Sequence, residues 1–588
     1  MFNKKTGIAA AALLLLLLWM PGKAVSADAA ENVPNVIPEM LTADFWIDKL
    51  PEPDQVIMDG EEIASFNRDI IRTQPELIYD LTDYPASLNK ERLTKLVTMR
   101  PFPDEDRYSN GRLVDWAYYQ NLKEQMNLPG IGEKNEVAYG VTVRRTNIRT
   151  FPTSDESLSE PDDKEFDLFQ ETAAGPAEPV LVLHHSLDGG WCFVQIYNYC
   201  GWMPAADIAV AKDKESWLAY VKPSEYLVVT GNRLGLGFPG PLPVELTMGT
   251  KVPLAGGREK GGVVPGQAKD YEVLLPVRGA NGELLTETAL IPGGADVSIG
   301  YLSYTRANII RQAFKILGER YGWGGMFNAR DCSAFVMDVY KSFGLMLPRN
   351  GDEQERSAGV TVSFEDLSTR QRYELLDTLL PGASLHTPTH ELLYLGRHEG
   401  LYYVIHDITS YGDASRPNPD GTLGKIVLNR VAVTDLSLPR RNGMLFIDSL
   451  TGGKQIQTRA GSSDSSSDYN VSVYLNGTLV DFPDQKPFID VSADRVFVPV
   501  RFVSEALGAQ VEWVREEQKI LINKDGKQIA LYVGRKEVFV DGRKYTLDVA
   551  VRLVNGRTMV PLRFVSEALG AGVKWTGQGS GGRVDITG

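Results

Sequence analysis

The clearest alternation of apolar and polar positions follows a glycine-rich aromatic loop near the middle of the chain. The loop begins at Tyr321 and leads into Asp331-Cys332-Ser333, after which apolar residues recur at helical spacing over residues 335–343. Asp331 is a favourable N-cap, which places Cys332 in the first helical turn. Because free N–H groups and the helix dipole favour an anion there, we expect the thiol to ionise more easily than a free cysteine.

The segments before this helix change from helical to strand periodicity. Residues 28–130 have a mostly helical pattern, with one helix starting after Asn89. Residues 131–213 alternate in short runs separated by Gly-Trp turns, which predicts a small β-barrel. Residues 214–299 predict a second small β unit, in which Asn281-Gly282 is a hairpin signal.

The segments after residue 300 divide into a domain, a linker and a repeat. Helices followed by strands predict an α+β domain over residues 300–448, and residues 449–470 have the composition of a flexible linker. Residues 471–588 contain an internal repeat, since Val498–Ala509 recurs as Val560–Ala571. Each copy predicts a short helix between strands, ended by a glycine at 508 or 570.

The N-terminus and the net charge bear on location. Residues 1–27 combine lysines, an apolar run and a small-residue cleavage site, which predicts a secretory signal peptide. The alternative is a membrane anchor, but the apolar run is short for a span. We therefore expect an exported mature chain without a transmembrane segment. A formal net charge of −15 argues against nucleic acid as a partner.

The chain has three cysteines. Cys192 and Cys200 lie in one hairpin-like segment and could form a disulfide after export, although the sequence cannot test the geometry. Cys332 would then remain as a free thiol. A buried structural cysteine is the alternative interpretation of Cys332, and the histidines that follow it favour a nucleophile.

Four of the six histidines follow Cys332 within the α+β domain. His390 opens one predicted strand and His406 ends the next, so adjacent antiparallel strands would bring the two rings together. One ring can take a thiol proton while the other orients it. His386 and His398 are expected in surface loops. A zinc site at His386 and His390 is disfavoured because Pro388 prevents a shared helix face, and we expect no metal.

These motifs resemble the NlpC family of papain-like cell-wall cysteine peptidases. The resemblance rests on Tyr-Gly-Trp-Gly-Gly at 321–325, Asp-Cys-Ser at 331–333, Leu-Pro-Arg-Asn at 347–350, and the segments around His390 and His406. It implies that Cys332 is the nucleophile, His390 the general base and acid, and His406 the orienting residue. No metal or organic cofactor is implied.

Residues 30–300 resemble the helical clip and paired SH3-like domains that precede this catalytic domain in one branch of the family. That branch hydrolyses the bond between γ-D-glutamate and the diamino acid of peptidoglycan stem peptides. The resemblance assigns substrate contacts to Tyr321, Trp323, Asp331, Ser333 and Tyr199. The alternative is a packing role alone for Tyr321 and Trp323, and a helix cap alone for Asp331.

One departure from the family pattern is Gly351, which stands where a small hydroxyl residue is expected after Arg-Asn. Residues 471–588 resemble the amine-oxidase N-terminal-like module of secreted bacterial proteins. No histidine follows His406, so a histidine-ligated copper site is excluded, and a stalk or a module binding a cell-wall ligand is expected.

The sequence thus predicts a multidomain chain: a mainly helical N-terminal region, two SH3-like β-barrels, an α+β papain-like domain and an α+β repeat module. The expected function is a secreted, cell-wall-located cysteine endopeptidase acting on peptidoglycan stem peptides or muropeptides. A non-catalytic cell-wall-binding protein, or an amidase or transpeptidase with the same Cys-His-His set, remains as the alternative.

Overall fold

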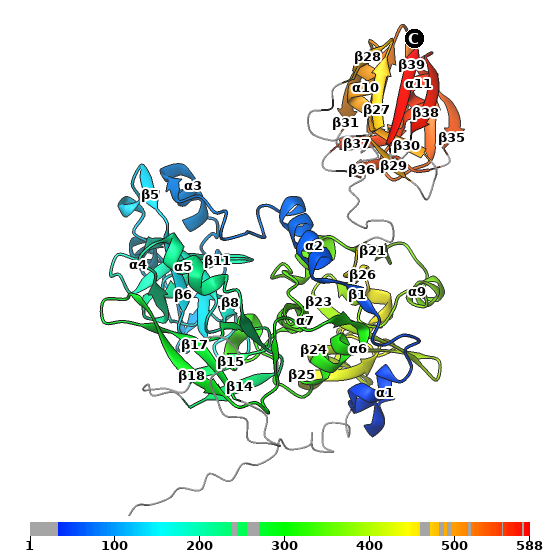
Figure 1. The fold of residues 1–588 in the computed structure, drawn as a ribbon. Helices are drawn as coiled ribbons and strands as arrows, with labels where there is room; N and C mark the ends of the chain where they lie inside the picture. Colours follow the sequence, from blue (N-terminus) through cyan, green and yellow to red (C-terminus); the bar gives the residue numbers. More distant parts are fainter. Residues whose placement is uncertain are drawn as a thin grey trace, which may run out of the picture. The chain divides into compact units, whose positions relative to one another are not determined.

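The computed structural model describes most of the chain (Figure 1). The expected signal peptide at 1–27 and the greater part of the expected linker lie outside the described residues. No described helix is long and apolar enough to cross a membrane. The chain divides into two compact units, the first with residues 33–59 and 70–457 and the second with 60–69 and the C-terminal module. The described residues are 33–237, 244–255, 270–458 and 471–587, the last without 481, 483–486, 491–494, 515–518, 548, 555–556 and 579–580.

The N-terminal region is mainly helical, as expected. Two of its helices begin at polar caps: the Asn89 side chain accepts a hydrogen bond from the Arg92 N–H at 2.8 Å, and Asp115 accepts one from the Tyr118 N–H at 2.9 Å. The elements are η2 (Pro38–Leu41), α1 (Ala43–Ile47), β1 (Val56–Met58), α2 (Gly60–Thr73), β2 (Ser87–Asn89), α3 (Lys90–Val97), β3 (Tyr108–Ser109), β4 (Arg112–Leu113), α4 (Trp116–Gln125), η3 (Leu128–Gly130) and β5 (Lys134–Glu136).

The first β domain is an antiparallel sheet in the order β12-β6-β9-β10-β11-β7-β8. Trp202 lies opposite Phe193 in the β10–β11 register and is fully buried, so the Gly-Trp segment contributes to the core. The strands are β6 (Ala138–Thr142), β7 (Thr146–Arg149), β8 (Gln170–Ala174), β9 (Pro179–His185), β10 (Trp191–Ile196), β11 (Tyr199–Pro204) and β12 (Ile208–Val210), with η4 (Ala205–Asp207) before β12.

The second β domain begins with a helix and continues as short antiparallel pairings. The hairpin expected at Asn281-Gly282 joins its two longest strands. The strands pair as β16-β13-β19, β14-β15 and β17-β18. The elements are α5 (Lys214–Val221), β13 (Tyr226–Val229), β14 (Arg233–Leu236), β15 (Val244–Thr247), β16 (Lys251–Pro253), β17 (Tyr271–Arg278), β18 (Leu284–Ile291) and β19 (Val297–Ile299).

The third domain places helices on a six-stranded antiparallel sheet in the order β21-β26-β22-β23-β24-β25. Helix α7 packs against β23 and β24 (Figure 1). The elements are β20 (Tyr304–Thr305), α6 (Arg306–Phe314), η5 (Trp323–Asn328), α7 (Cys332–Lys341), α8 (Gly351–Arg356), β21 (Val360–Ser363), α9 (Thr369–Leu376), β22 (Ser384–Thr387), β23 (His390–His398), β24 (Leu401–Pro417), β25 (Leu423–Asp435), η6 (Ile447–Ser449) and β26 (Gly452–Gln455).

Strand β26 corrects the expected start of the linker at residue 449. Gly452 and Gly453 suggested a flexible segment, but β26 pairs with both β21 and β22. A Cβ on Gly453 would lie 2.8 Å from Leu379 Cδ1 and 3.2 Å from Phe364 Cε2. The glycine is therefore required by close packing, and its presence does not indicate flexibility.

The C-terminal unit confirms the internal repeat. In the β30–β37 pair, Val498 lies opposite Val560, its equivalent in the second copy. Gly508 and Gly570 follow the two helices with φ of +81° and +87°, as expected for helix-ending glycines. The elements are β27 (Val471–Leu475), β28 (Thr478–Leu479), β29 (Phe488–Asp490), β30 (Arg495–Pro499), α10 (Val500–Ala506), β31 (Gln510–Val514), β32 (Lys519–Lys524), β33 (Lys527–Tyr532), β34 (Glu537–Val540), β35 (Arg543–Thr546), β36 (Arg552–Val554), β37 (Arg557–Pro561), α11 (Leu562–Ala568), β38 (Gly572–Gln578) and β39 (Gly581–Thr587).

The packing of Gly453 yields a stability prediction. Gly453→Ala should destabilise the first unit by about 1–3 kcal/mol, because the added methyl overpacks a filled core. Thermal unfolding followed by circular dichroism should show a midpoint several degrees lower. Gly235→Ala is the control, since a Cβ on this β14 glycine meets nothing within 4 Å. Equal midpoints for the two variants would show that β26 tolerates a side chain.

Candidate active site

The glycine-rich loop before α7 lies against the first β domain. Gly324 and Gly325 have φ of +55° and +88°, backbone angles that residues with a Cβ rarely adopt. A Cβ on Gly324 would lie 2.8 Å from the Gln170 carbonyl oxygen, and one on Gly325 would lie 2.6 Å from Ala173 Cβ. The paired glycines thus let the loop approach β8 closely.

Side chains of the first β domain also bind this loop through its carbonyl groups. The Gln170 amide donates to the Gly324 carbonyl at 2.8 Å, and the Arg145 guanidinium donates to the Ala329 carbonyl at 2.9 Å. These hydrogen bonds hold both ends of the turn that precedes Asp331. The sequence predicted the loop but not its dependence on another domain.

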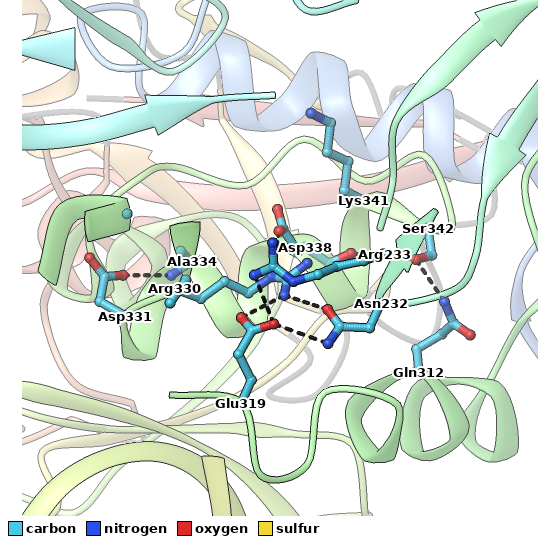
Figure 2. Close-up of polar contacts among 12 residues, drawn as sticks. Asn232, Arg233, Gln312, Glu319, Arg330, Asp331, Ala334, Asp338, Lys341 and Ser342 are labelled. Carbon is cyan, nitrogen blue, oxygen red and sulfur yellow. Dashed lines mark hydrogen bonds and ion pairs between the residues drawn. The ribbon is translucent and has the colours of Figure 1, made fainter. Parts of the chain in front are cut away.

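Arg330 connects the same loop to the second β domain (Figure 2). Its guanidinium is buried and donates to Asp338 at 2.7 Å, to Glu319 at 2.8 Å and to Asn232 at 2.7 Å. The Asn232 amide in turn donates to Glu319 at 3.0 Å. The residue before Asp331 is therefore fixed by two domains at once.

A second buried arginine, Arg349, holds Asp331. Its Nη2 lies 2.6 Å from Asp331 Oδ2, its Nη1 donates to Ser333 Oγ at 2.9 Å, and its Nε donates to Thr172 Oγ1 on β8 at 2.6 Å. Burial alone would raise the pKa of Asp331, but the Arg349 charge lowers it below its ordinary value. Asp331 is thus an ionised carboxylate inside the protein.

These contacts bear on the expected substrate roles of Asp331 and Ser333. Asp331 also accepts from the N–H groups of Gly324 and Ala334, each at 3.0 Å, so it is the N-cap of α7 and both of its oxygens are occupied. The hydroxyl of Ser333 is buried against Arg349. The geometry supports the helix-cap alternative for Asp331 and an internal contact for Ser333.

Cys332 is the first residue of α7, as expected, and keeps part of its side chain exposed. Its thiol accepts a hydrogen bond from the backbone N–H of Glu391, the residue after His390. Burial, reinforced by the Asp331 carboxylate, nevertheless raises the pKa of the thiol well above its ordinary value. The expectation of a readily ionised thiol is therefore wrong for the resting site.

The two expected histidines meet on adjacent strands. His390 Nε2 and His406 Nδ1 are 2.7 Å apart, and the His406 Nε2 lies 3.0 Å from Thr434 Oγ1 on β25. Burial lowers the pKa of His390 to about 3, with Arg440 adding to the effect, and places that of His406 well below its ordinary value. Both imidazoles are neutral at rest. Thr434 was not identified from the sequence.

The hydrogen-bond chain specifies one useful tautomer. If His406 donates from Nε2 to Thr434 Oγ1, its Nδ1 accepts from His390 Nε2–H, and His390 Nδ1 is left as a base. In the described part of the chain no hydrogen bond joins Cys332 directly to His390. The Glu391 N–H brings the thiol to the start of β23 instead.

The remaining expected substrate residues are placed differently from one another. Tyr321 is buried, and burial together with the adjacent Cys332 raises the pKa of its hydroxyl. Trp323 is 37% exposed and packs edge-on against Phe166 of the first β domain, with ring centroids 5.6 Å apart. The Tyr199 hydroxyl donates to Glu171, which also forms a 2.8 Å ion pair with Arg100.

The possible disulfide between Cys192 and Cys200 is not formed in the structure, where both are free thiols. Cys192 lies opposite Met203 and Cys200 lies opposite Gln195, so the two belong to different rungs of the β10–β11 pair. Their side chains also join different buried clusters of the domain. Short sequence separation in a hairpin did not imply adjacency.

His386 corrects another expectation, since it is 1% exposed in β22 and contacts Ser384 Oγ at 2.9 Å. His398 ends β23 with its side chain 24% exposed, so it lies on a strand as well. Within the described ranges no group of three or more histidine, cysteine or acidic side chains is arranged to hold a metal ion.

Two buried carboxyl groups that the sequence did not single out lie next to the histidines in sequence. Glu391 and Asp407 are 0% exposed, and none of their carboxyl oxygens has a hydrogen-bond partner within the described residues. Burial raises the pKa of Asp407 to about 9 and that of Glu391 well above its ordinary value, so both are protonated at neutral pH. Gly351 adjoins Glu391: a Cβ there would lie 3.3 Å from Glu391 Oε2.

A helix that begins with cysteine, packed on antiparallel strands that carry two hydrogen-bonded histidines, defines a papain-like cysteine hydrolase. The family comparisons agree. Residues 318–409 match the NlpC/P60 family, residues 156–204 match the SH3 domain of SH3b1 type, and residues 474–581 match the copper amine oxidase N-terminal domain. The chain thus carries the catalytic domain of the NlpC/P60 cell-wall peptidases, whose members are cysteine endopeptidases.

One solved structure has a related fold. An NlpC/P60 endopeptidase from Photobacterium damselae subsp. piscicida is 19% identical with a TM-score of 0.57, over 69% of this chain and 95% of that one. An NlpC/P60 family protein from Bacillus cereus is 18% identical with a TM-score of 0.38, over 55% of this chain and 100% of that one.

A curated relative of this chain is a protease inhibitor from Brevibacillus choshinensis. It is 33% identical over 136 residues, which make up 23% of this chain and 40% of the relative. The chain therefore spans less than half the length of that protein.

The raised thiol pKa predicts how Cys332 reacts with iodoacetamide. Because the thiolate is the reactive form, the alkylation rate should keep rising up to about pH 9 without a plateau. Mass spectrometry should locate the adduct on Cys332 alone, since Cys192 and Cys200 are 4% and 9% exposed. Cys332→Ser is the control. A plateau below about pH 7 would instead indicate a thiolate–imidazolium pair.

The buried Asp407 predicts a pH-dependent stability. Burial raises the pKa of its carboxyl group from 3.8 to about 9. As pH rises between those values, the unfolded chain has lost this proton while the folded chain still holds it, so the folded state loses stability. The slope is at most about 1.4 kcal/mol per pH unit. Asp407→Asn should remove this pH dependence. The unfolding midpoint of the variant should therefore exceed that of the native protein by an amount that increases from pH 5 to pH 8. Exposed Asp83→Asn is the control; a constant difference would contradict the assignment.

Proposed function

We propose that this protein is a secreted peptidoglycan hydrolase that cleaves the bond between γ-D-glutamate and the diamino acid of stem peptides. The observation that carries the proposal is the hydrogen-bonded pair of His390 and His406, 2.7 Å apart, at the strand start that also contacts the Cys332 thiol through the Glu391 N–H. Export rests on the expected signal peptide at residues 1–27.

The resting protonation states determine the first step. Because thiol and imidazole are both neutral, the Cys332 proton passes to His390 Nδ1 as the sulfur attacks the γ-glutamyl carbonyl carbon. The backbone N–H of Cys332, free at the start of α7, is placed to donate to the developing oxyanion. His406 stabilises the resulting imidazolium through His390 Nε2, and Thr434 orients His406.

The second half of the reaction regenerates the enzyme. His390 returns its proton to the leaving amine as the C–N bond breaks, which leaves a thioester on Cys332. His390 then takes a proton from water, whose oxygen attacks the thioester carbonyl and releases the γ-glutamyl product. His390 finally returns that proton to sulfur.

The first β domain supports binding of the acyl part of the substrate. Trp323 offers an exposed ring beside Phe166 of this domain. Tyr199 and Glu171 supply polar groups on the same domain, and Arg100 of the N-terminal region pairs with Glu171. Tyr199 and Cys332 both contribute to the electrostatic environment of Arg349, which relates this cluster to the nucleophile. A γ-linked dipeptide with a free amine suits such a surface, since Glu171 can accept from an ammonium group.

A product analysis tests the proposal. The native protein should release L-Ala-γ-D-Glu from L-Ala-γ-D-Glu-diaminopimelate peptides, as read by mass spectrometry. Cys332→Ala should lower the rate by about 10³-fold or more, because covalent catalysis is lost. Cys192→Ala, which removes a buried thiol of the first β domain, is the matched control.

The same experiment separates the alternatives by their products. Equal cleavage by native protein and Cys332→Ala would refute cysteine catalysis. Cleavage at a different bond would indicate an amidase, and a joined product would indicate a transpeptidase. Binding to cell walls without any cleavage would indicate a binding protein.

A further inference from the structure

A pocket of about 600 Å³ opens in the catalytic domain next to His390. Pro388 and Thr389, the two residues before His390, form part of its wall, and the other lining residues come from the α9 region and the segment between β25 and β26. Its charged lining residues are Glu365, Asp366, Arg372, Arg440 and Asp448.

Arg440 is fixed beside the catalytic pair. Its Nη2 donates to Thr389 Oγ1 at 2.8 Å, and its guanidinium carbon lies 5.8 Å from the centre of the Phe446 ring. The same ring packs against His390 and His406, with centroids 6.2 and 5.7 Å away. Arg440 therefore has a defined position, next to the group that protonates the leaving amine.

Arg440 lacks the carboxylate partner that other buried arginines of the domain have. Arg330 and Arg349 each form ion pairs at 2.6–2.8 Å, whereas no described carboxylate pairs with Arg440, although its side chain is half-buried. Arg372 shares the pocket but donates to the carbonyls of Leu367, Ile447 and Leu450. Within the described residues the Arg440 side chain donates to Thr389 alone, so of the two lining guanidinium groups it has more donors left for an anion.

The position of the pocket relative to the nucleophile indicates which part of a substrate it meets. On one side of Cys332, its neighbour Asp331 contacts Arg349, which contacts Thr172 of the first β domain. On the other side, the thiol contacts the start of β23, where Thr389 precedes His390 and binds Arg440. The acyl part is proposed to lie toward the first β domain. A peptide across Cys332 and His390 then places its leaving residue over Thr389.

We propose that Arg440 binds a carboxylate of the leaving residue and is a specificity-determining residue for that side of the bond. The inference rests on the proposed function. A planar guanidinium can hold a carboxylate through two parallel hydrogen bonds, and partial burial strengthens them. On the rim, exposed Glu365 and Asp366 form no ion pair within the described residues and can face an ammonium group of the same residue.

The carboxylate has two sources that substrate design can separate. A diamino acid at the third position of L-Ala-γ-D-Glu-X carries an α-carboxylate, and diaminopimelate carries a second one on its side chain. Four peptides cover the cases: X is diaminopimelate or lysine, each with a free or an amidated α-carboxyl group. The amidated lysine peptide has no carboxylate on its leaving residue.

The test compares kcat/KM of the native protein and Arg440→Gln on these four peptides. Losing a charge-assisted hydrogen bond should lower kcat/KM by about 10- to 100-fold wherever the contacted carboxylate is present, and by less than about twofold for the amidated lysine peptide. If kcat/KM falls only on the two peptides with a free α-carboxyl group, Arg440 contacts that group. If it falls only on the two diaminopimelate peptides, Arg440 contacts the side-chain carboxylate. Arg440→Lys should recover part of the loss.

Two controls keep the result interpretable. Arg441→Gln makes the same charge change at the adjacent, exposed residue and should leave all four values unchanged. An unaltered rate of Cys332 alkylation in Arg440→Gln shows that the site is intact. Equal loss on all four peptides, or no loss on any, would overturn the assignment of Arg440 while leaving the proposed function standing. If the native protein cleaves none of the peptides, both are overturned.

Discussion

The buried ion pair between Asp331 and Arg349 is the interaction on which the rest of the active site depends. The two side chains are 9% and 3% exposed, so their charges are largely removed from water and are tolerable only as a pair. Arg349 extends the pair to Thr172 in the first β domain, and Asp331 extends it to the start of α7. Losing one partner of such a pair typically costs about 3–5 kcal/mol, because it leaves an uncompensated charge. The position of Cys332 therefore depends on domain packing as well as on the local sequence.

The electrostatics of the site follow from the same burial. A helix N-terminus stabilises an anion by about 0.3–1 kcal/mol, and up to about 2 kcal/mol in favourable geometry. Burial can shift a pKa by about 3–5 units, which corresponds to more than about 4 kcal/mol. Burial therefore outweighs the helix effect at Cys332, and the neighbouring Asp331 carboxylate acts in the same direction. A neutral thiol beside a neutral imidazole is the result, and the proton moves only when a substrate carbonyl accepts the sulfur.

Features set by local sequence were predictable. The N-cap at Asp331, the helix after it and the pairing of His390 with His406 depend on spacing and turn chemistry, and all three are present. Features set by distant packing were not. Position 453 needs a glycine because neighbouring side chains pack closely there, and flexibility is not the reason. Arg330 and Arg349 each take one of their contacts from another domain, at Asn232 and Thr172. Thr434 follows a strand pairing that local periodicity does not specify.

Gly351 and Glu391 show how one departure from a family pattern can affect the surroundings of a neighbouring side chain. Glu391 buries a carboxyl group under the strand start that contacts Cys332, and the missing side chain at Gly351 leaves room for it. A hydroxyl side chain at 351 would crowd this carboxyl or satisfy it with a hydrogen bond; the glycine does neither, and Glu391 stays protonated. A neutral acid adds less repulsion to the thiolate that forms during attack than a charged one would. Because residue 351 has no side chain, the Glu391 carboxyl group remains next to His390, the proposed base, and burial keeps that carboxyl group uncharged.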